Sequence, residues 1–241
     1  MKLSVIVPAY NEEKLIGRCL ASIHDALVAN ARAGLETELI VADNNSTDRT
    51  AELARAAGAN VVFEPVNQIS RARNAGAAAA TGDWFLFVDA DSFPSAGLIG
   101  ATIDVMERGG VVGGGSEIDF GPFAWWARPG ISLLSVVMRL WCWAAGSYIF
   151  CRADAFRAAG GFSLELYVSE EIDLSKRMKQ YGRTLGLRFV ILRGHPLLTS
   201  ARKLDLYGPM KMLKTLFYVL FNPRRGPRDK RGLGLWYDGK R

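Results

Sequence analysis

Two aspartates separated by one residue, Asp89 and Asp91, directly follow an apolar run at residues 84–88. A buried strand ending at residue 88 would bring both carboxylates out on one side of a sheet, with Ala90 between them. Mg²⁺ and Mn²⁺ favour hard oxygen ligands, often one or two carboxylates together with phosphate oxygens. Asp89 and Asp91 are therefore candidate ligands of a divalent cation that holds a diphosphate. Taken alone, the same pattern is more often a solvated aspartate turn.

A second acidic cluster, Glu170, Glu171 and Asp173, precedes a helix predicted at residues 174–181. Acidic side chains stabilise a helix N-terminus through its dipole, so a structural role explains the cluster about as well as a chemical one. Crowded carboxylates raise one another's pKa, which suits one of them to accept a proton from an attacking hydroxyl group. The cluster is thus a candidate general base.

His195 follows a β-like run at 187–192, and Arg71, Arg73 and Asn74 open a predicted helix. A lone histidine is more often structural than functional, but its position at a predicted strand end makes His195 a candidate metal or phosphate ligand. At the start of a helix, backbone donors and basic side chains can bind an anion. Solvated arginines would produce the same pattern.

The first half of the chain alternates β-branched runs with helical patterns, which indicates strand–helix–strand units and a largely parallel sheet. Strands are predicted at residues 3–8, 38–43, 60–64 and 84–88, and helices at 12–29, 46–58 and 70–81. Asn11 is the predicted N-cap of the first helix. Ligands of open α/β sheets lie beyond the carboxyl ends of the strands. Polar residues follow three strands at that edge: residues 8–12, residues 43–48 and the turn at 89–91.

After Pro94 the pattern changes and predicts a second lobe resting on the first. Its elements are a helix at 96–108, a glycine-interrupted strand at 109–118, an aromatic stretch at 120–126 and a long helix before Gly146. The most apolar long window, residues 131–150, has about the length of a membrane span but contains Arg139 near its centre. Buried helix and strand, or a surface that touches lipid, is the favoured interpretation.

The composition is that of a folded globular protein: 241 residues, 49% hydrophobic and 22% charged, with a formal net charge of +6. Residues 202–241 hold eleven Lys/Arg and three Asp/Glu, a net charge of +8, so the basic character lies in the tail. This basic amphipathic tail favours docking on the core or on anionic lipid. Widely spaced cysteines and an N-terminus unlike a secretion signal predict a cytoplasmic protein, with peripheral contact at the inner face of the membrane as a further expectation.

Together these motifs resemble the family 2 glycosyltransferases of the GT-A fold over residues 3–205. Residues 4–12 (SVIVPAYNE) are similar to the first strand and nucleotide loop of that family, and residues 41–50 to its second strand end, where an aspartate contacts the base. Residues 72–76 and 82–84 lead into the metal motif at 89–91, and residues 150–162 are similar to an acceptor-side segment. Residues 169–174 (SEEIDL) match a Glu-Asp-x-Asp-Leu motif, except that Glu171 replaces the usual aspartate. Residues 199–203 are similar to a segment that follows a ligand histidine, which supports His195.

The resemblance implies an α/β, nucleotide-diphospho-sugar transferase fold with a Rossmann-like, mostly parallel central sheet flanked by helices. It implies a glycosyltransferase domain at residues 1–205, with a nucleotide-sugar-binding half at 1–95 and an acceptor-side half at 96–205. A basic amphipathic C-terminal extension would follow at 206–241.

The resemblance further implies an inverting transfer of a sugar from a nucleoside-diphosphate sugar, with UDP preferred over GDP, to a hydroxyl group of a saccharide or lipid-linked acceptor. Asp91, with Asp89 and His195, would hold Mn²⁺ or Mg²⁺. Glu171 would be the general base, with Asp173 or Glu170 as second choice. The expected contacts to the nucleotide sugar are Pro8, Ala9, Tyr10, Glu12, Asp43, Asn45, Arg71, Arg73, Asn74, Asp89 and Ala90.

Two other classes of function compete with this hypothesis. One is a protein that binds nucleotide sugars without transferring them, against which both acidic motifs argue. The other is a nucleic-acid-binding module driven by the basic tail, which would show a steep salt dependence of binding. The enzyme is favoured, no nucleic-acid partner is expected, and the sequence does not indicate an oligomeric state.

Overall fold

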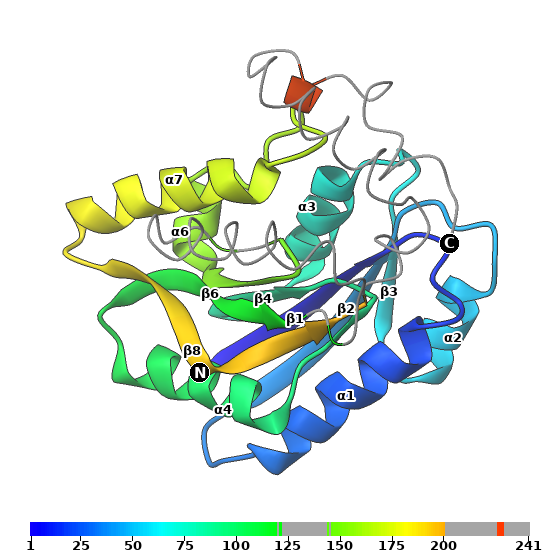
Figure 1. Ribbon diagram of the computed structural model, residues 1–241, viewed down its shortest axis with the longest axis horizontal. Coiled ribbons are helices and arrows are strands. Elements are labelled where there is room, and N and C mark those ends of the chain that lie inside the picture. The colour runs from blue at the N-terminus through cyan, green and yellow to red at the C-terminus, as the bar shows by residue number, and fades with distance from the viewer. Residues whose placement is uncertain (120, 122–143, 145, 201–225, 229–241) are drawn as a thin grey trace.

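The computed structural model describes residues 1–119, 121, 144, 146–200 and 226–228 (Figure 1). The strands, in chain order, are β1 (Lys2–Ala9), β2 (Glu36–Asp43), β3 (Asn60–Phe63), β4 (Trp84–Val88), β5 (Ser92–Phe93), β6 (Val111–Asp119), β7 (Tyr148–Arg152) and β8 (Arg188–Thr199). The helices are α1 (Ile16–Ala29), α2 (Thr50–Ala56), α3 (Ile69–Ala79), α4 (Ala96–Arg108), α6 (Ala153–Ala158) and α7 (Glu170–Thr184), and Gly226–Arg228 form a short 3₁₀ turn.

All eight strands belong to one sheet, in the order β3-β2-β1-β4-β7-β6-β8-β5. Strands β1 to β4 pair in parallel, which confirms the parallel first half. β7 is antiparallel to both of its neighbours, β4 and β6, while β8 pairs in parallel with β6 and antiparallel with β5. The carboxyl ends of β1, β2, β4 and β6 therefore lie at the same edge of the sheet.

Helices cover both faces of the sheet: α1 and α4 on one face, and α3, α6 and α7 on the other (Figure 1). Side chains alternate between two cores along each central strand, because successive residues of a strand point to opposite faces. In β1, Val5 and Val7 join the core under α1 and α4, while Ile6 joins the core under α3. Burial on both faces explains why these strands read as continuous apolar runs.

A glycine lets α3 pack directly against β1. A Cβ atom added to Gly76 would collide with Cγ2 of Ile6, so a side chain at position 76 would force α3 or Ile6 to shift. The close approach places α3 beside β1, next to the edge of the sheet where β1, β2 and β4 end.

Three sequence predictions need correction at their boundaries. The first helix begins at Ile16 rather than at residue 12, and Asn11 is not its N-cap: Asn11 has a φ of 52°, and its Oδ1 accepts a hydrogen bond from Thr47 N–H at 2.8 Å. Helix α7 begins at Glu170, so the acidic cluster lies within its first turn. β8 continues to Thr199, which places His195 inside the strand and not at its end.

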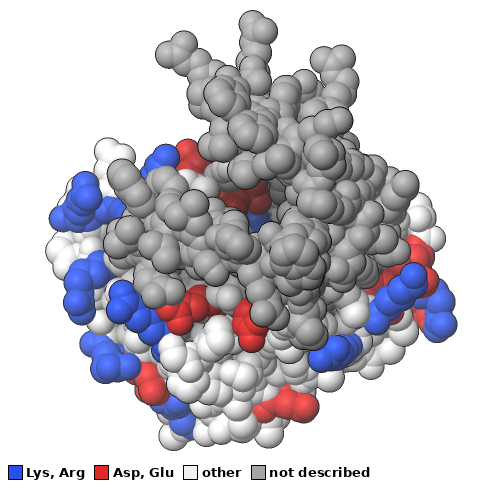
Figure 2. Space-filling model, in the orientation of Figure 1, with Lys and Arg blue, Asp and Glu red and all other residues white. Residues whose placement is uncertain are grey.

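Several predicted features lie outside the described residues. These are most of the aromatic stretch at 120–126, the long helix before Gly146, and the basic tail except for residues 226–228. Within the described ranges, no helix is both long enough and apolar enough to cross a membrane. Basic side chains gather on the flank where α7 ends and β8 begins, where Arg183 and Arg188 are exposed (Figure 2). Local positive charge is thus not confined to the tail.

Candidate functional site

The loops that follow β1 and β2 are joined by hydrogen bonds at the edge of the sheet where these strands end. The main-chain N–H of Asn11 donates to Oγ of Ser46 at 3.0 Å, and that of Glu12 donates to Oγ1 of Thr50 at 2.8 Å. Asn11 and Asn45 both adopt the left-handed conformation, with φ of 52° and 65°. Such values are uncommon outside glycine but tolerated by asparagine. The two loops therefore form one preorganised surface.

Asp43 ends β2 next to Ala9, its register partner in β1. Its side chain is buried, and Oδ1 accepts a hydrogen bond from the N–H of Ser46 at 3.3 Å. Nδ2 of Asn45 donates to Oδ1 of Asn67 at 3.0 Å, which ties the loop to the start of α3. The structure thus brings together one group of predicted nucleotide contacts: Pro8, Ala9, Tyr10, Glu12, Asp43 and Asn45.

The turn at 89–91 connects β4 to β5 and is held from two sides. The carbonyl of Asp89 accepts a hydrogen bond from Ser92 N–H at 3.0 Å and a weaker one from the Cys19 thiol of α1, with Sγ 3.6 Å away. The carbonyl of Asp91 accepts from Ser200 N–H at 3.0 Å. Ala90 is buried, whereas both aspartates are partly exposed. The prediction that both carboxylates emerge at the end of β4 is confirmed.

Arg73 joins this turn to the acidic cluster. Its Nη2 donates to Oδ1 of Asp89 at 2.9 Å and to the carbonyl of Gly146 at 2.8 Å, and its Nη1 donates to Oε1 of Glu170 at 2.8 Å. A Cβ added to Gly146 would lie 3.3 Å from Nη2 of Arg73 and 3.5 Å from Cδ of Glu171. These five residues, which we call the Arg73 cluster, bring the two acidic motifs to one place.

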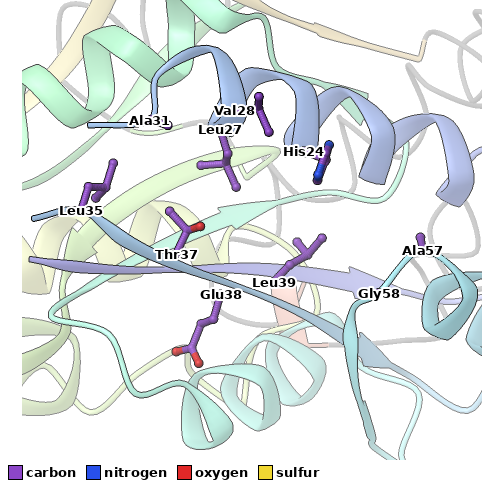
Figure 3. Close-up of a pocket in the computed structure, with 10 residues that line it drawn as sticks. All are labelled: His24, Leu27, Val28, Ala31, Leu35, Thr37, Glu38, Leu39, Ala57 and Gly58. Carbon is purple, nitrogen blue, oxygen red and sulfur yellow. The ribbon is translucent and has the colours of Figure 1, made fainter. Parts of the chain in front are cut away.

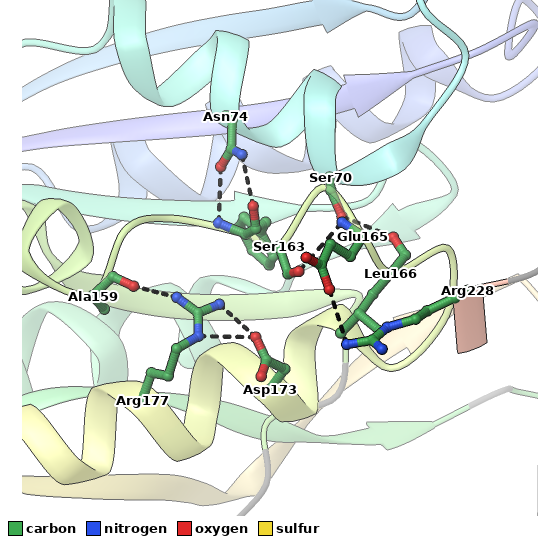
Figure 4. Close-up of polar contacts among 10 residues, drawn as sticks. Ser70, Asn74, Ala159, Ser163, Glu165, Leu166, Asp173, Arg177 and Arg228 are labelled. Atoms are coloured by element: carbon green, nitrogen blue, oxygen red, sulfur yellow. Dashed lines mark hydrogen bonds and ion pairs between the residues drawn. The ribbon is translucent and has the colours of Figure 1, made fainter. Parts of the chain in front are cut away.

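The three carboxylates at the start of α7 have different environments. Glu170 is buried and paired with Arg73, whereas Asp173 forms a partly exposed ion pair with Arg177, 2.6 Å between Oδ2 and Nη2. Arg177 also donates to the carbonyl of Ala159 (Figure 4). Burial, and then the negative charge of Glu170, raise the pKa of Glu171 above its ordinary value. The raised pKa makes Glu171 the candidate among these three carboxylates to exchange a proton, and its role as general base stays a prediction.

The raised pKa of Glu171 predicts a pH-dependent contribution to stability. The folded protein binds this proton more tightly than the unfolded chain, so the free energy of unfolding should fall as pH rises from the ordinary value of 4.5 towards the raised pKa. Chemical denaturation at a series of pH values, in wild type and Glu171→Gln, measures this contribution as the difference between them. The free energy of unfolding of wild type minus that of Glu171→Gln should decrease with rising pH. A difference that does not change with pH would contradict the raised pKa.

Asp89 and Asp91 fit a divalent cation that also binds phosphate. In the part of the chain that the structure describes, no group of three His, Cys, Asp or Glu side chains is arranged to hold a metal ion. Two carboxylates suffice for Mg²⁺ or Mn²⁺ when phosphate oxygens complete the coordination. Asp89 and Glu170 share the single guanidinium of Arg73, so the one positive charge does not cancel the negative charge of both carboxylates.

His195 is not brought into such a group. It is exposed in the middle of β8 and packs on the start of α4, where a Cβ added to Gly97 would lie 2.7 Å from its Nδ1. Its predicted strand-end position is wrong because β8 continues past it, while its role as a metal ligand, which the resemblance of residues 199–203 also supports, stays a prediction.

Sequence reasoning missed how α3 and the residue before it hold the segment at residues 162–166. Asn74, predicted to face an anion, instead uses both amide atoms on the main chain of Phe162, each at 2.9 Å (Figure 4). Nε2 of Gln68 donates to the carbonyls of Leu164 and Leu166, at 2.8 and 3.0 Å. Arg71, by contrast, is partly exposed at the start of α3, where its predicted anion contact stays a prediction.

A surface groove lies away from this site. It runs between α1 and the start of β2 (Figure 3), and its lining is mostly apolar: His24, Leu27, Val28, Ala31, Leu35, Thr37, Glu38, Leu39, Ala57 and Gly58. The start of β2 is at the opposite edge of the sheet from Asp43, and Oε1 of Glu38 already accepts hydrogen bonds from Ser4 and Thr81. The groove does not belong to the Arg73 cluster.

Comparison with known proteins places the chain in a family. A Mycobacterium tuberculosis protein named as an uncharacterized glycosyltransferase is 34% identical over 139 residues, which cover 57% of this chain and 59% of that protein. The chain thus spans less than two thirds of the length of such curated relatives.

Solved structures share the fold. Glucosyl-3-phosphoglycerate synthase from Mycobacterium tuberculosis, in complex with Mn²⁺, UDP and glucosyl-3-phosphoglycerate, superposes with a TM-score of 0.62 and 25% identity over 95% of this chain and 81% of its own. A mannosyltransferase from Pyrobaculum calidifontis, in complex with GDP-Man and Mn²⁺, gives a TM-score of 0.64 at 19% identity over 88% of this chain and 59% of its own. The model of the family described as Glycosyl transferase family 2 matches residues 4–155, and with the GT-A architecture this shows that the chain belongs to glycosyl transferase family 2.

Proposed function

We propose that this protein is a metal-dependent inverting glycosyltransferase. It would transfer a sugar from a nucleoside-diphosphate sugar, with UDP preferred over GDP, to a hydroxyl group of a saccharide or lipid-linked acceptor. The observation that carries the proposal is the Arg73 cluster, which joins the Asp89–Asp91 turn to the candidate base Glu171. A cation site for a diphosphate and a base for a hydroxyl group are the two parts that such a transfer requires.

Related proteins support the choice of donor and cation. The synthase from Mycobacterium tuberculosis was solved with Mn²⁺ and UDP, and the mannosyltransferase from Pyrobaculum calidifontis with Mn²⁺ and GDP-Man. The fastened loops after β1 and β2 lie at the same sheet edge as the Asp89–Asp91 turn, which suits one nucleotide bound across them. We therefore assign the nucleotide to these loops and the diphosphate to the turn.

Each part of the site has a chemical task in this proposal. Asp89 and Asp91 hold the divalent cation, which when bound neutralises charge on the departing nucleoside diphosphate. Glu171 accepts the proton of the acceptor hydroxyl as the new bond from oxygen to the sugar carbon forms and the bond from that carbon to the diphosphate breaks. Glu170 pairs with Arg73, and its charge together with burial raises the pKa of Glu171, which favours proton uptake by that carboxylate.

A thermal-shift panel tests the proposed donor class. The full chain is heated with UDP, GDP, UDP-glucose or GDP-mannose, each with Mn²⁺ and with EDTA. A ligand that binds only the folded state stabilises it, by about 2.7 kcal/mol at a concentration of 100 times Kd. We expect a raised midpoint with at least one of these nucleotides, and only when Mn²⁺ is present.

Two outcomes would overturn parts of the proposal. No shift with any nucleotide in the presence of Mn²⁺ would contradict the donor site. A shift without any release of nucleoside diphosphate from the sugar nucleotide, even with a pool of saccharide and lipid-linked acceptors, would instead indicate a protein that binds nucleotide sugars without transferring them.

A further inference from the structure

Arg73 connects the two halves of the site through its side chain alone. One terminal nitrogen of the guanidinium contacts Asp89, after β4, and the other contacts Glu170, in the first turn of α7. We propose that Arg73 is a positioning residue: it fixes the distance between the cation-binding turn and the candidate base Glu171. This inference rests on the proposed transferase function and assigns Arg73 a role other than the predicted contact to a donor phosphate.

The burial of Arg73 shows that it is not a surface residue that happens to reach a carboxylate. Its side chain is 2% exposed, and Nε is buried without a hydrogen-bond partner. Arginine stays charged in proteins, so this burial carries a large desolvation penalty. Replacing a buried ion network with apolar side chains of similar volume is often neutral or stabilising. Stability alone is thus a poor explanation for a charged residue at this position.

The geometry of the guanidinium explains what the charge can do here. Its donors lie in one plane and point in fixed directions, whereas lysine presents its donors from a single nitrogen. Nη2 serves Asp89 and the carbonyl of Gly146, and Nη1 serves Glu170. Movement of the turn relative to α7 would break at least one of these bonds. The guanidinium therefore fixes the position of the two acidic motifs relative to each other.

Asn74, the next residue of α3, supports the same arrangement through its contacts to Phe162. Its side chain fixes the main chain of Phe162, and the Phe162 ring centre lies 5.0 Å from Cζ of Arg73, within the range of a cation–π contact. Gly161 makes this approach feasible: its φ is 68°, and a Cβ there would lie 2.8 Å from Oδ1 of Asn74. Two consecutive residues of α3 therefore orient the guanidinium and its aromatic support.

The test compares Arg73→Lys and Arg73→Met with Arg32→Met. Arg32 is a matched control because its Nη1 also contacts two carboxylates, Asp104 at 3.0 Å and Glu107 at 2.8 Å. Both carboxylates belong to α4, and the Arg32 side chain is partly exposed. The measurements are kcat and donor KM for transfer, per nucleotide-binding site counted by titration, together with the midpoint of thermal unfolding. We expect Arg73→Lys to fold and to lose about 10²-fold in kcat, as a misplacement of about 1 Å can cause, with a smaller change in donor KM. Arg32→Met should leave both kinetic constants unchanged.

Glu170→Gln provides a second route if both Arg73 variants fail to fold. It preserves shape and the Arg73–Asp89 pair but weakens the contact to α7, so kcat should fall while nucleotide binding persists. The inference is overturned if Arg73→Lys keeps the wild-type kcat per binding site, so that any lost activity only reflects lost folded protein. Where no Arg73 variant folds, it is overturned if Glu170→Gln keeps the wild-type kcat. A wild-type protein without transfer would overturn the proposed function and this inference together, whereas an active wild type with an equally active Arg73→Lys would overturn this inference alone.

Discussion

Replacing Asp91 with alanine should abolish metal-dependent release of nucleoside diphosphate while leaving the fold intact. Asp91 is partly exposed at the end of β4, and the turn that carries it is held by main-chain bonds to Ser92 and Ser200. Its side chain can therefore be removed without opening the core. Loss of a cation that neutralises the leaving group should cost about 10³-fold or more in kcat, because such charge stabilisation is worth several kcal/mol. A continuous assay of UDP or GDP release, with Mn²⁺ titrated, measures the effect.

Asp25→Ala is the matched control for this variant. Asp25 is an exposed carboxylate on α1, with a side chain 83% exposed, and it has no part in the site. Its replacement should change neither kcat nor the dependence on Mn²⁺. Undiminished turnover by Asp91→Ala would show that this turn does not bind the catalytic cation. Wild-type turnover that does not depend on Mn²⁺ would show the same.

Glu171→Gln should lose transfer and retain nucleotide binding. The amide keeps the size of the side chain and cannot accept the acceptor proton, and general-base catalysis contributes about 10²–10⁴-fold to rate. Because Glu171 stands on α7 and the nucleotide loops follow β1 and β2, binding of the donor should be little affected. Transfer to acceptor and calorimetric binding of nucleotide, measured on the same preparation, separate the two effects.

Asp173→Asn tests the alternative base on the same helix. Asp173 pairs with Arg177 on a partly exposed surface, so its carboxylate is already engaged by a side chain of the same helix (Figure 4). We expect Asp173→Asn to reduce kcat much less than Glu171→Gln does. The opposite ranking would assign the base to Asp173 and contradict a catalytic role for Glu171.

The central sheet and the order of its elements could be predicted from sequence because local patterns encode them. The strand predicted at 84–88 coincides with β4, and the helix predicted at 96–108 coincides with α4. Apolar residues spaced for a buried strand, and glycines where helices stop, depend on the immediate neighbours in the chain. The strand ends that carry polar residues followed from the same patterns.

The Arg73 cluster could not be predicted because its partners are distant in sequence. Arg73 bonds with residues 16, 73 and 97 positions away, and no local pattern specifies such contacts. The sequence does contain one local indication of a buried charge. Arg73 lies at helical spacing with the buried residues Gly76, Ala77 and Ala80, so a charged residue occupies the apolar face of the helix. A charge in that position requires a buried partner, which the two acidic motifs supply.

Errors at Asn11 and His195 have a common physical cause. Both predicted positions rest on the rule that a helix or strand begins and ends where its apolar pattern does. The loop after β1 is instead shaped by bonds to the loop after β2, and β8 is extended by its pairing with Ser92 and Phe93 of β5. Tertiary contacts therefore moved both boundaries.

Calorimetric titration of UDP and of GDP into the full chain, first with Mn²⁺ and then with excess EDTA, tests most directly whether a divalent cation at Asp89 and Asp91 anchors a nucleoside diphosphate. We expect saturable binding of at least one of the two nucleotides with Mn²⁺, and loss of that binding both with EDTA and in Asp91→Ala. Binding of equal affinity with and without Mn²⁺, or no binding of either nucleotide when Mn²⁺ is supplied, would contradict this expectation.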